Sequence, residues 1–189
     1  MGKLLVLGLG NLLAADDGLG VAAVEELGRR YHAPEGVEVL DGGTLGLSLM
    51  HCFEGAEAVI LVDAIRTEDP AGTLVRLRGE EVAPAARDRL SVHQIGVTDL
   101  LDGLAWLDRS PRRLTLLGLV PESLEWGVGC SPAVAGQLPR LVEEVVVEAA
   151  RMGHRFVPRS QDRVATSDPA AQVSPAARVL RRPLGLPAE

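Results

Sequence analysis

The chain has 189 residues, of which 47% are hydrophobic but only 3% aromatic, and this size suits one domain with an aliphatic core. Its formal net charge of −7 argues against binding to nucleic acid or to anionic membranes, both of which require basic patches. Lys3 is the only lysine, which excludes a P-loop and argues against Schiff-base catalysis.

The apolar runs are too short to cross a membrane, and the first of them has the pattern of a strand and lacks the cleavage region of a signal peptide. The two cysteines, Cys52 and Cys130, lie far apart and outside any CxxC spacing. These features are typical of a cytoplasmic protein with reduced thiols, without membrane insertion.

Five segments have the pattern of strands. Three are nearly continuous apolar runs, typical of strands buried on both faces, and one alternates apolar and basic residues, as an edge strand does. The five are residues 3–8, 37–41, 56–63, 73–78 and 113–120. Helical spacing of apolar residues recurs between and after them, over residues 19–27, 45–53, 97–107 and 141–152. The alternation predicts an α/β fold, a three-layer sandwich with helices on both faces of a twisted, largely parallel sheet.

The composition changes near the end of the chain. Residues 159–189 are rich in Pro, Ala, Ser and Arg, and their five arginines against three acids give +2, which leaves −9 on residues 1–158. Their short apolar pieces cannot offset the entropy lost on ordering. The sequence therefore predicts one folded domain over residues 1–158 and a disordered tail over residues 159–189.

Acidic side chains follow three of the predicted strands. In open parallel sheets, ligands bind beyond the carboxyl ends of the strands, so these positions are candidates for a site. They are Asp16 and Asp17 after the first strand, Asp41-Gly42-Gly43-Thr44 at the end of the second, and Asp63 at the end of the third. A carboxylate in the apolar surroundings of Asp63 requires a cation or hydrogen bonds.

A histidine supplies a further candidate. Residues 91–94, Ser-Val-His-Gln, have the spacing of a capping box, which places His93 at the second residue of a helix. The positive end of the helix dipole favours the neutral imidazole there, and this is the form that ligates metals. Asp17, Asp63 and His93 would then form a three-ligand site with open positions for nickel, zinc or another divalent transition metal.

Each residue also has a simpler interpretation. Asp17 precedes a predicted helix and would serve as its N-cap, and Asp63 would cap or form a salt bridge at a strand end. Both cysteines are expected to pack in the interior, with no base paired to either thiol. A dinucleotide site after the first strand is disfavoured, because Leu13 stands where the third glycine of GxGxxG is needed and acids follow it.

Several motifs together resemble those of the hydrogenase maturation endopeptidases, which process the large-subunit precursor of nickel–iron hydrogenases. The segments are GNLLAADDGLG, LDGGTLGLSL, LVDAIR, SVHQIG and GLVPESLEWGVGCSP, in order over about residues 3–158. The resemblance implies a twisted mixed sheet between helices. It also implies an endopeptidase that removes a short C-terminal peptide from the precursor after nickel insertion.

The resemblance further implies that Asp17, Asp63 and His93 are the metal-contacting residues, with Asp or Glu accepted at the first position. It places the Asp41-Gly42-Gly43-Thr44 loop beside the site, where we expect it to contact substrate. Cys130 departs from the aliphatic residue usual in relatives, which supports a packing role.

Nickel would come with the precursor, and zinc or cadmium would serve as a surrogate. Two catalysts remain open, the metal itself or Asp17 or Asp63 acting as general base in the manner of an aspartyl protease. The alternative function is a nickel chaperone without enzymatic activity that uses the same three residues.

Overall fold

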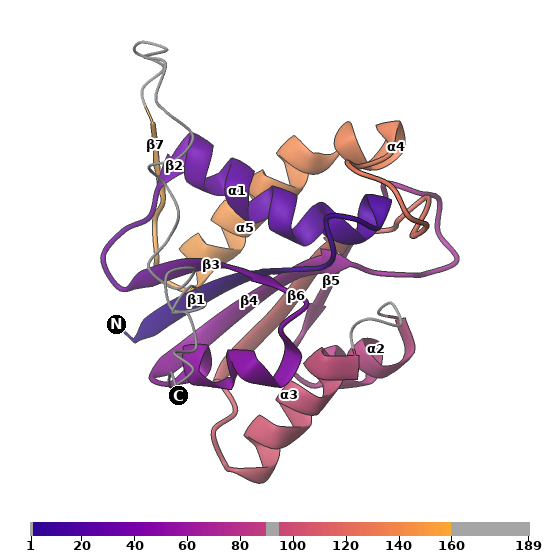
Figure 1. The fold of residues 1–189 in the computed structure, drawn as a ribbon. Coiled ribbons are helices and arrows are strands. Elements are labelled where there is room, and N and C mark those ends of the chain that lie inside the picture. Colours follow the sequence, from indigo (N-terminus) through magenta and orange to yellow (C-terminus); the bar gives the residue numbers. More distant parts are fainter. Residues whose placement is uncertain (1, 90–94, 160–189) are drawn as a thin grey trace, which may run out of the picture. The chain divides into compact units, whose positions relative to one another are not determined.

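A five-stranded sheet forms the centre of the fold (Figure 1). In the computed structural model, which describes residues 2–89 and 95–159, its strands lie in the order β3-β1-β4-β6-β5. The first four in this order are parallel, and β5 runs antiparallel to β6 at the edge. The strands are β1 Lys3–Leu9, β3 Val37–Gly43, β4 Ala56–Ala64, β5 Leu74–Arg78 and β6 Arg113–Leu119. All five predicted strands are confirmed, and the strand predicted at an edge lies there.

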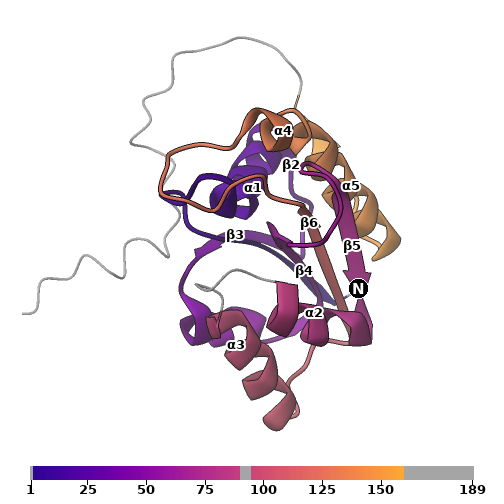
Figure 2. The same ribbon diagram turned by 90° about the vertical axis from the view of Figure 1, so that its right-hand side faces the viewer.

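Helices cover both faces of the sheet, as Figure 2 shows. One face carries α1 Leu19–Arg30 and α5 Leu138–Arg151, and the other carries η2 Gly46–Phe53, α2 Val82–Arg89 and α3 Ile95–Trp106. Along β1, Leu4 and Val6 pack in the first core, whereas Leu5 and Leu7 pack in the second. A central strand is apolar at every position because successive side chains enter opposite cores. The predicted three-layer α/β sandwich is confirmed.

Shorter elements complete the described chain. Residues 45–53 were expected to be helical, and most of them form the tighter 3₁₀ helix η2. In α4, which spans Pro132–Ala135, the proline occupies the first turn and the Ser131 hydroxyl accepts a hydrogen bond from the Val134 N–H. The remaining short elements are η1 Ala15–Gly18, β2 Tyr31–His32, η3 Gly79–Glu81, α4 Pro132–Ala135 and β7 Val157–Pro158.

The compact unit extends to Arg159, which we expected to begin the tail. The Arg159 N–H donates to Arg30 O at 2.8 Å, and Arg159 Nε donates to Gly28 O at 2.9 Å and Tyr31 O at 3.1 Å. These bonds tie the residue to the end of α1. Residues 160–189 lie outside the described part, so the disordered tail stays a prediction. None of the helices over residues 2–89 and 95–159 is long and apolar enough to span a membrane.

A buried carboxylate joins the edge strand β5 to α5. Glu148 is 3% exposed and accepts two hydrogen bonds from Arg78, at 2.9 and 2.6 Å, one from Thr115 Oγ1 at 3.1 Å and one from Arg151 at 3.2 Å. The Arg78 guanidinium lowers the pKa of Glu148 from 4.5 to about 2, although burial alone would raise it. The basic face of the predicted edge strand therefore pairs with acids of α5.

We predict that Glu148→Gln lowers the free energy of unfolding at neutral pH by about 2–3 kcal/mol. The folded-state pKa is depressed, so the charged carboxylate contributes its full stabilisation above pH 4.5 and loses it as the pH falls toward about 2. The difference between wild type and variant should therefore shrink over this interval. Urea denaturation followed by circular dichroism, from neutral pH down to about pH 3, measures it.

Glu143→Gln is the matched control on the same helix. Its carboxylate is 59% exposed and lies 3.4 Å from Arg30, so its removal should cost less than about 1 kcal/mol at every pH. If the stability loss caused by Glu148→Gln stayed constant with pH, it would contradict a charged, stabilising Glu148 with a depressed pKa.

We also predict that truncation after Arg159 leaves the melting temperature nearly unchanged, because the described helices and strands all end before the cut. Differential scanning calorimetry of the two chain lengths tests this. A fall of about 5 °C or more would show that residues 160–189 stabilise the folded unit.

Candidate active site

The predicted acidic positions meet at one edge of the sheet. Because β1, β3, β4 and β6 are parallel, their carboxyl ends lie together. Asp63 is the next-to-last residue of β4, Asp17 lies in η1 beyond β1, and Asp41 to Gly43 end β3. Since η1 also packs against β4, the turn that carries Asp17 adjoins the strand that carries Asp63.

Two glycines allow this close packing. A Cβ at Gly10, whose φ is +121°, would lie 1.7 Å from the carbonyl oxygen of Asp17. A Cβ at Gly20, in the first turn of α1, would lie 2.1 Å from Val62 O and 2.3 Å from Leu9 O. The glycines of GNLLAADDGLG thus let α1 and η1 sit directly on the ends of β1 and β4, and this packing fixes the position of Asp17.

Asp17 is 1% exposed, and its Oδ2 accepts a hydrogen bond from the Asn11 N–H at 2.9 Å. Gly18 is the N-cap of α1, and no side chain caps α1 or η1. The interpretation of Asp17 as a helix cap is therefore wrong. Its carboxylate instead faces the loop that leaves β1.

Asp63 is fully buried, and its Oδ1 accepts a hydrogen bond from the Ala64 N–H at 2.7 Å. It belongs to a central strand that pairs with β1 on one side and β6 on the other. Two buried carboxylates, Asp17 and Asp63, thus lie at one sheet edge. The backbone hydrogen bonds that both carboxylates accept offset part of the cost of their burial.

His93 and its capping box, residues 91–94, lie outside the described residues. Within residues 2–89 and 95–159, no group of three His, Cys, Asp or Glu side chains is arranged to hold a metal ion. The metal-contacting set of Asp17, Asp63 and His93 therefore stays a prediction.

The Asp41-Gly42-Gly43-Thr44 loop lies beside the same edge. Gly43 O accepts a hydrogen bond from the Gly10 N–H at 3.0 Å, and Asp41 Oδ1 accepts one from the Gly43 N–H at 2.9 Å. Gly42 is buried, whereas Asp41 and Thr44 are exposed. The loop thus presents two polar side chains next to the turn that leads to Asp17.

Asp16, the neighbour of Asp17, has a role that the sequence analysis missed. It is fully buried, its Oδ2 accepts the N–H groups of Glu122 and Ser123 at 2.8 and 3.1 Å, and its Oδ1 accepts that of Ser131 at 2.6 Å. Three backbone donors occupy most of the acceptor capacity of one carboxylate. Asp16 therefore fixes the loop of residues 121–131.

The cysteines behave as packing residues, with one correction. Cys52 Sγ lies 3.4 Å from His51 Nε2, so the expectation that neither thiol is paired with a base was wrong for Cys52. Burial and the charge of Glu38 nevertheless raise the pKa of Cys52, which disfavours the nucleophilic thiolate. Burial and the charge of Asp16 raise the pKa of Cys130, which packs against the core beside α1 and α5.

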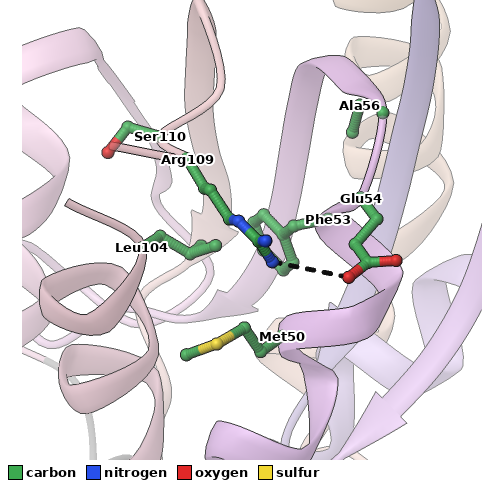
Figure 3. Close-up of a pocket in the computed structure, with 8 residues that line it drawn as sticks. Met50, Phe53, Glu54, Ala56, Leu104, Arg109 and Ser110 are labelled. Carbon is green, nitrogen blue, oxygen red and sulfur yellow. Dashed lines mark hydrogen bonds and ion pairs between the residues drawn. The ribbon is translucent and has the colours of Figure 1, made fainter. Parts of the chain in front are cut away.

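One pocket lies at the acidic edge and another at the opposite edge. The first, of about 280 Å³, follows the ends of β4 and β6 and is lined by Arg66, Thr67 and residues 120–124. The second, of about 460 Å³, lies at the start of β4, where an Arg109–Glu54 ion pair of 3.5 Å crosses it (Figure 3). Neither Asp17 nor Asp63 lines this larger pocket.

Comparison with known proteins identifies the class. Residues 21–148 match the sequence profile of the hydrogenase maturation protease family, HycI. The chain is 39% identical over 158 residues to the hydrogenase 2 maturation protease of Escherichia coli, covering 83% of this chain and 96% of the relative. It is 40% identical over 153 residues to the hydrogenase expression/formation protein HupD of Rhodobacter capsulatus, covering 80% of this chain and 73% of the relative.

The fold agrees. The hydrogenase maturating endopeptidase HybD from E. coli superposes with a TM-score of 0.80 at 38% identity, over 85% of this chain and 99% of that chain. HybD from Thermococcus kodakarensis superposes with a TM-score of 0.67 at 29% identity, over 78% of this chain and 99% of that chain. The chain is therefore a peptidase, and it belongs to the hydrogenase maturation protease family. This membership decides against the dinucleotide-binding and chaperone alternatives.

We predict that replacing the two adjacent acids lowers the free energy of unfolding by unequal amounts. Asp16→Asn turns an NH₂ group toward backbone N–H donors and should lower the free energy of unfolding by about 2–4 kcal/mol. Asp17→Asn keeps an acceptor for the Asn11 N–H and should cost about 1 kcal/mol or less. Urea denaturation of both variants measures the difference.

Hydrogen exchange adds a local readout. In Asp16→Asn, the amides of Glu122, Ser123 and Ser131 should exchange faster, whereas in Asp17→Asn they should keep their wild-type protection. Equal destabilisation by the two variants would contradict the division of roles between these residues.

Proposed function

We propose that the protein is an endopeptidase that removes a C-terminal peptide from the nickel-loaded precursor of a nickel–iron hydrogenase large subunit. Its family and the name of the E. coli hydrogenase 2 maturation protease support a hydrogenase protein as the substrate. The observation that carries the proposal is the pair of carboxylates, Asp17 and Asp63, that are 1% and 0% exposed at the carboxyl edge of the sheet.

In this proposal, nickel is part of the substrate. Asp17 and Asp63 offer oxygen donors, and His93 is the predicted nitrogen donor, a mixed set that suits nickel and also accepts zinc or cadmium. The carboxylates are already held by backbone N–H groups, those of Asn11 and Ala64. A precursor that carries its nickel would be held with the peptide bond in position, and one without nickel would not.

Hydrolysis adds water to the carbonyl carbon of the peptide bond, breaks the C–N bond and protonates the leaving amine. Asp17 or Asp63 would accept the proton of the attacking water as general base. The alternative is that nickel polarises the carbonyl oxygen or lowers the pKa of the water. Both routes need the two carboxylates at this edge.

The Asp41-Gly42-Gly43-Thr44 loop would contact the substrate. Gly43 of this loop bonds to Gly10, from which the chain leads into the turn that carries Asp17, and the flanking Asp41 and Thr44 are exposed. Hydrogen bonds from this loop to the substrate main chain would align the segment to be cut.

Incubation with purified precursor tests the proposal. We expect the nickel-loaded precursor to lose its C-terminal peptide, seen by mass spectrometry as a smaller protein with a new C-terminus, and the nickel-free precursor to stay intact. Asp17→Asn, Asp63→Asn and His93→Gln should each slow cleavage by about 100-fold or more, because each removes a group acting at the reacting bond.

Metal binding separates the ligand role from folding. Calorimetric titration with zinc or cadmium should show weaker binding for Asp17→Asn and His93→Gln, while His32→Gln, at an exposed histidine on β2, should match wild type in binding and cleavage. Transfer of nickel without cleavage, or normal processing by both ligand variants, would contradict the proposal.

A further inference from the structure

Four large apolar side chains are exposed on two loops at the carboxyl edge of the sheet. They are 47%, 55%, 82% and 87% exposed, and we call them the apolar rim: Leu12, Leu13, Trp126 and Val128. Single exposed apolar residues are ordinary, but a group that includes a tryptophan is a mark of an interaction surface.

The two loops form one fixed unit. The Gly127 N–H donates to Leu13 O at 3.0 Å, and the Ala15 N–H donates to Gly127 O at 2.8 Å. These bonds are part of a short parallel bridge between Ala14 and Gly127. The buried Asp16 carboxylate holds the second loop at both ends through Glu122, Ser123 and Ser131. Preorganised apolar groups bind with a smaller loss of conformational entropy than mobile ones.

The rim is continuous with the candidate active site. Leu12 follows Asn11, whose N–H donates to Asp17 Oδ2 at 2.9 Å. Leu12 also packs against η1, since a Cβ at Gly18 would lie 2.9 Å from Leu12 Cα. A protein whose peptide bond reaches Asp17 must therefore cover these loops.

Charge narrows the chemistry of the partner. Residues 121–131 include the exposed Glu122 and Glu125 and no basic residue, whereas Asp16 and Asp17 of the first loop are buried. Arg66 lines the small pocket next to Glu122, which leaves Glu125 as the acid beside Trp126. Complementarity requires an apolar surface bordered by Arg or Lys. A second copy of the chain docked on this rim would block the edge that carries the carboxylates, which makes it a poor occupant for an active peptidase.

We propose that the apolar rim is the docking surface for the folded precursor, and that it receives an apolar patch with a basic border next to the peptide to be cut. This rests on the proposed function, since the occupant is the same substrate. Trp126 would supply the anchor, because a rigid aromatic side chain buries much area at little entropic cost.

The chain contains a matched control. Its other tryptophan, Trp106, is 88% exposed but ends α3, near the pocket at the start of β4 and away from the acidic edge. Both tryptophans are more than four-fifths exposed, so neither Trp126→Ser nor Trp106→Ser should change the melting temperature appreciably.

Cleavage kinetics give the first test. We expect Trp126→Ser to raise KM for the nickel-loaded precursor about tenfold or more, with kcat within about twofold of wild type at saturating precursor, because the rim binds substrate and does not touch the reacting bond. Trp106→Ser should match wild type in both constants. An unchanged KM for Trp126→Ser, with active wild type, overturns the docking surface alone, whereas inactive wild type overturns the proposed function.

A direct measurement avoids any change at the rim. With both tryptophans replaced by 5-fluorotryptophan in an Asp17→Asn background, which slows cleavage, a saturating concentration of unlabelled nickel-loaded precursor should shift the ¹⁹F resonance of Trp126 and leave that of Trp106 in place. Shifts of both resonances or of neither would overturn the proposal. So would a wild-type dimer in analytical ultracentrifugation that Trp126→Ser dissociates, because a second copy would then occupy the rim.

Discussion

The geometry of the acidic edge depends on one buried carboxylate, Asp16. Three backbone N–H groups, from Glu122, Ser123 and Ser131, converge on its two oxygens at 2.6–3.1 Å. Hydrogen bonds to a charged acceptor are about twice as strong as neutral ones, and burial strengthens them further. Apart from the single bridge between Ala14 and Gly127, the loop of residues 121–131 is not part of a strand ladder, so the bonds to Asp16 supply much of its support. The loop of residues 121–131 is thereby held in place although its backbone is irregular.

The turn after β1, which carries Asp16, also requires close contact between backbone segments. α1 reaches the ends of β1 and β4 only because Gly20 presents no side chain to Val62 O and Leu9 O, and η1 closes only because Gly10 presents none to Asp17 O. A glycine-rich turn after a first strand is usually associated with phosphate binding. Here the glycines instead leave room for the backbone of neighbouring segments. The two acids that follow have different partners: Asp16 accepts hydrogen bonds from the amides of the 121–131 loop, and Asp17 accepts one from the Asn11 N–H beside the strand ends.

The sheet could be predicted because the pattern of apolar residues in each strand depends on whether one or both of its faces are buried. Runs such as that of β1 are apolar at every position, which only burial on both faces explains, and the alternation in β5 indicated an edge.

The direction of β5 and its pairing with Glu148 could not be predicted, since ion pairs between residues 70 positions apart leave no local pattern. Nor could the sequence tell Asp16 from Asp17: adjacent identical side chains differ only in the direction that the backbone gives them. Cys52 and His51 show the same limit, because neighbours in sequence contact or diverge according to helix type.

The two edges of the sheet differ in kind, and this difference bears on what an acidic protein can bind. At the edge where β5 ends and β6 begins, the charged side chains form ion pairs with one another: Arg76, Arg78 and Arg151 with Glu144 and Glu148. These ion pairs hold α5 to the sheet. At the opposite edge, the buried Asp16 and Asp17 follow the loop that carries the exposed Leu12 and Leu13. Asp17 and Asp63 accept hydrogen bonds from the backbone N–H groups of Asn11 and Ala64, and the exposed apolar groups nearby would exclude water from under a partner that covers them. In the proposed function, the nickel of the precursor would therefore reach these carboxylates in a site from which the docked protein excludes water.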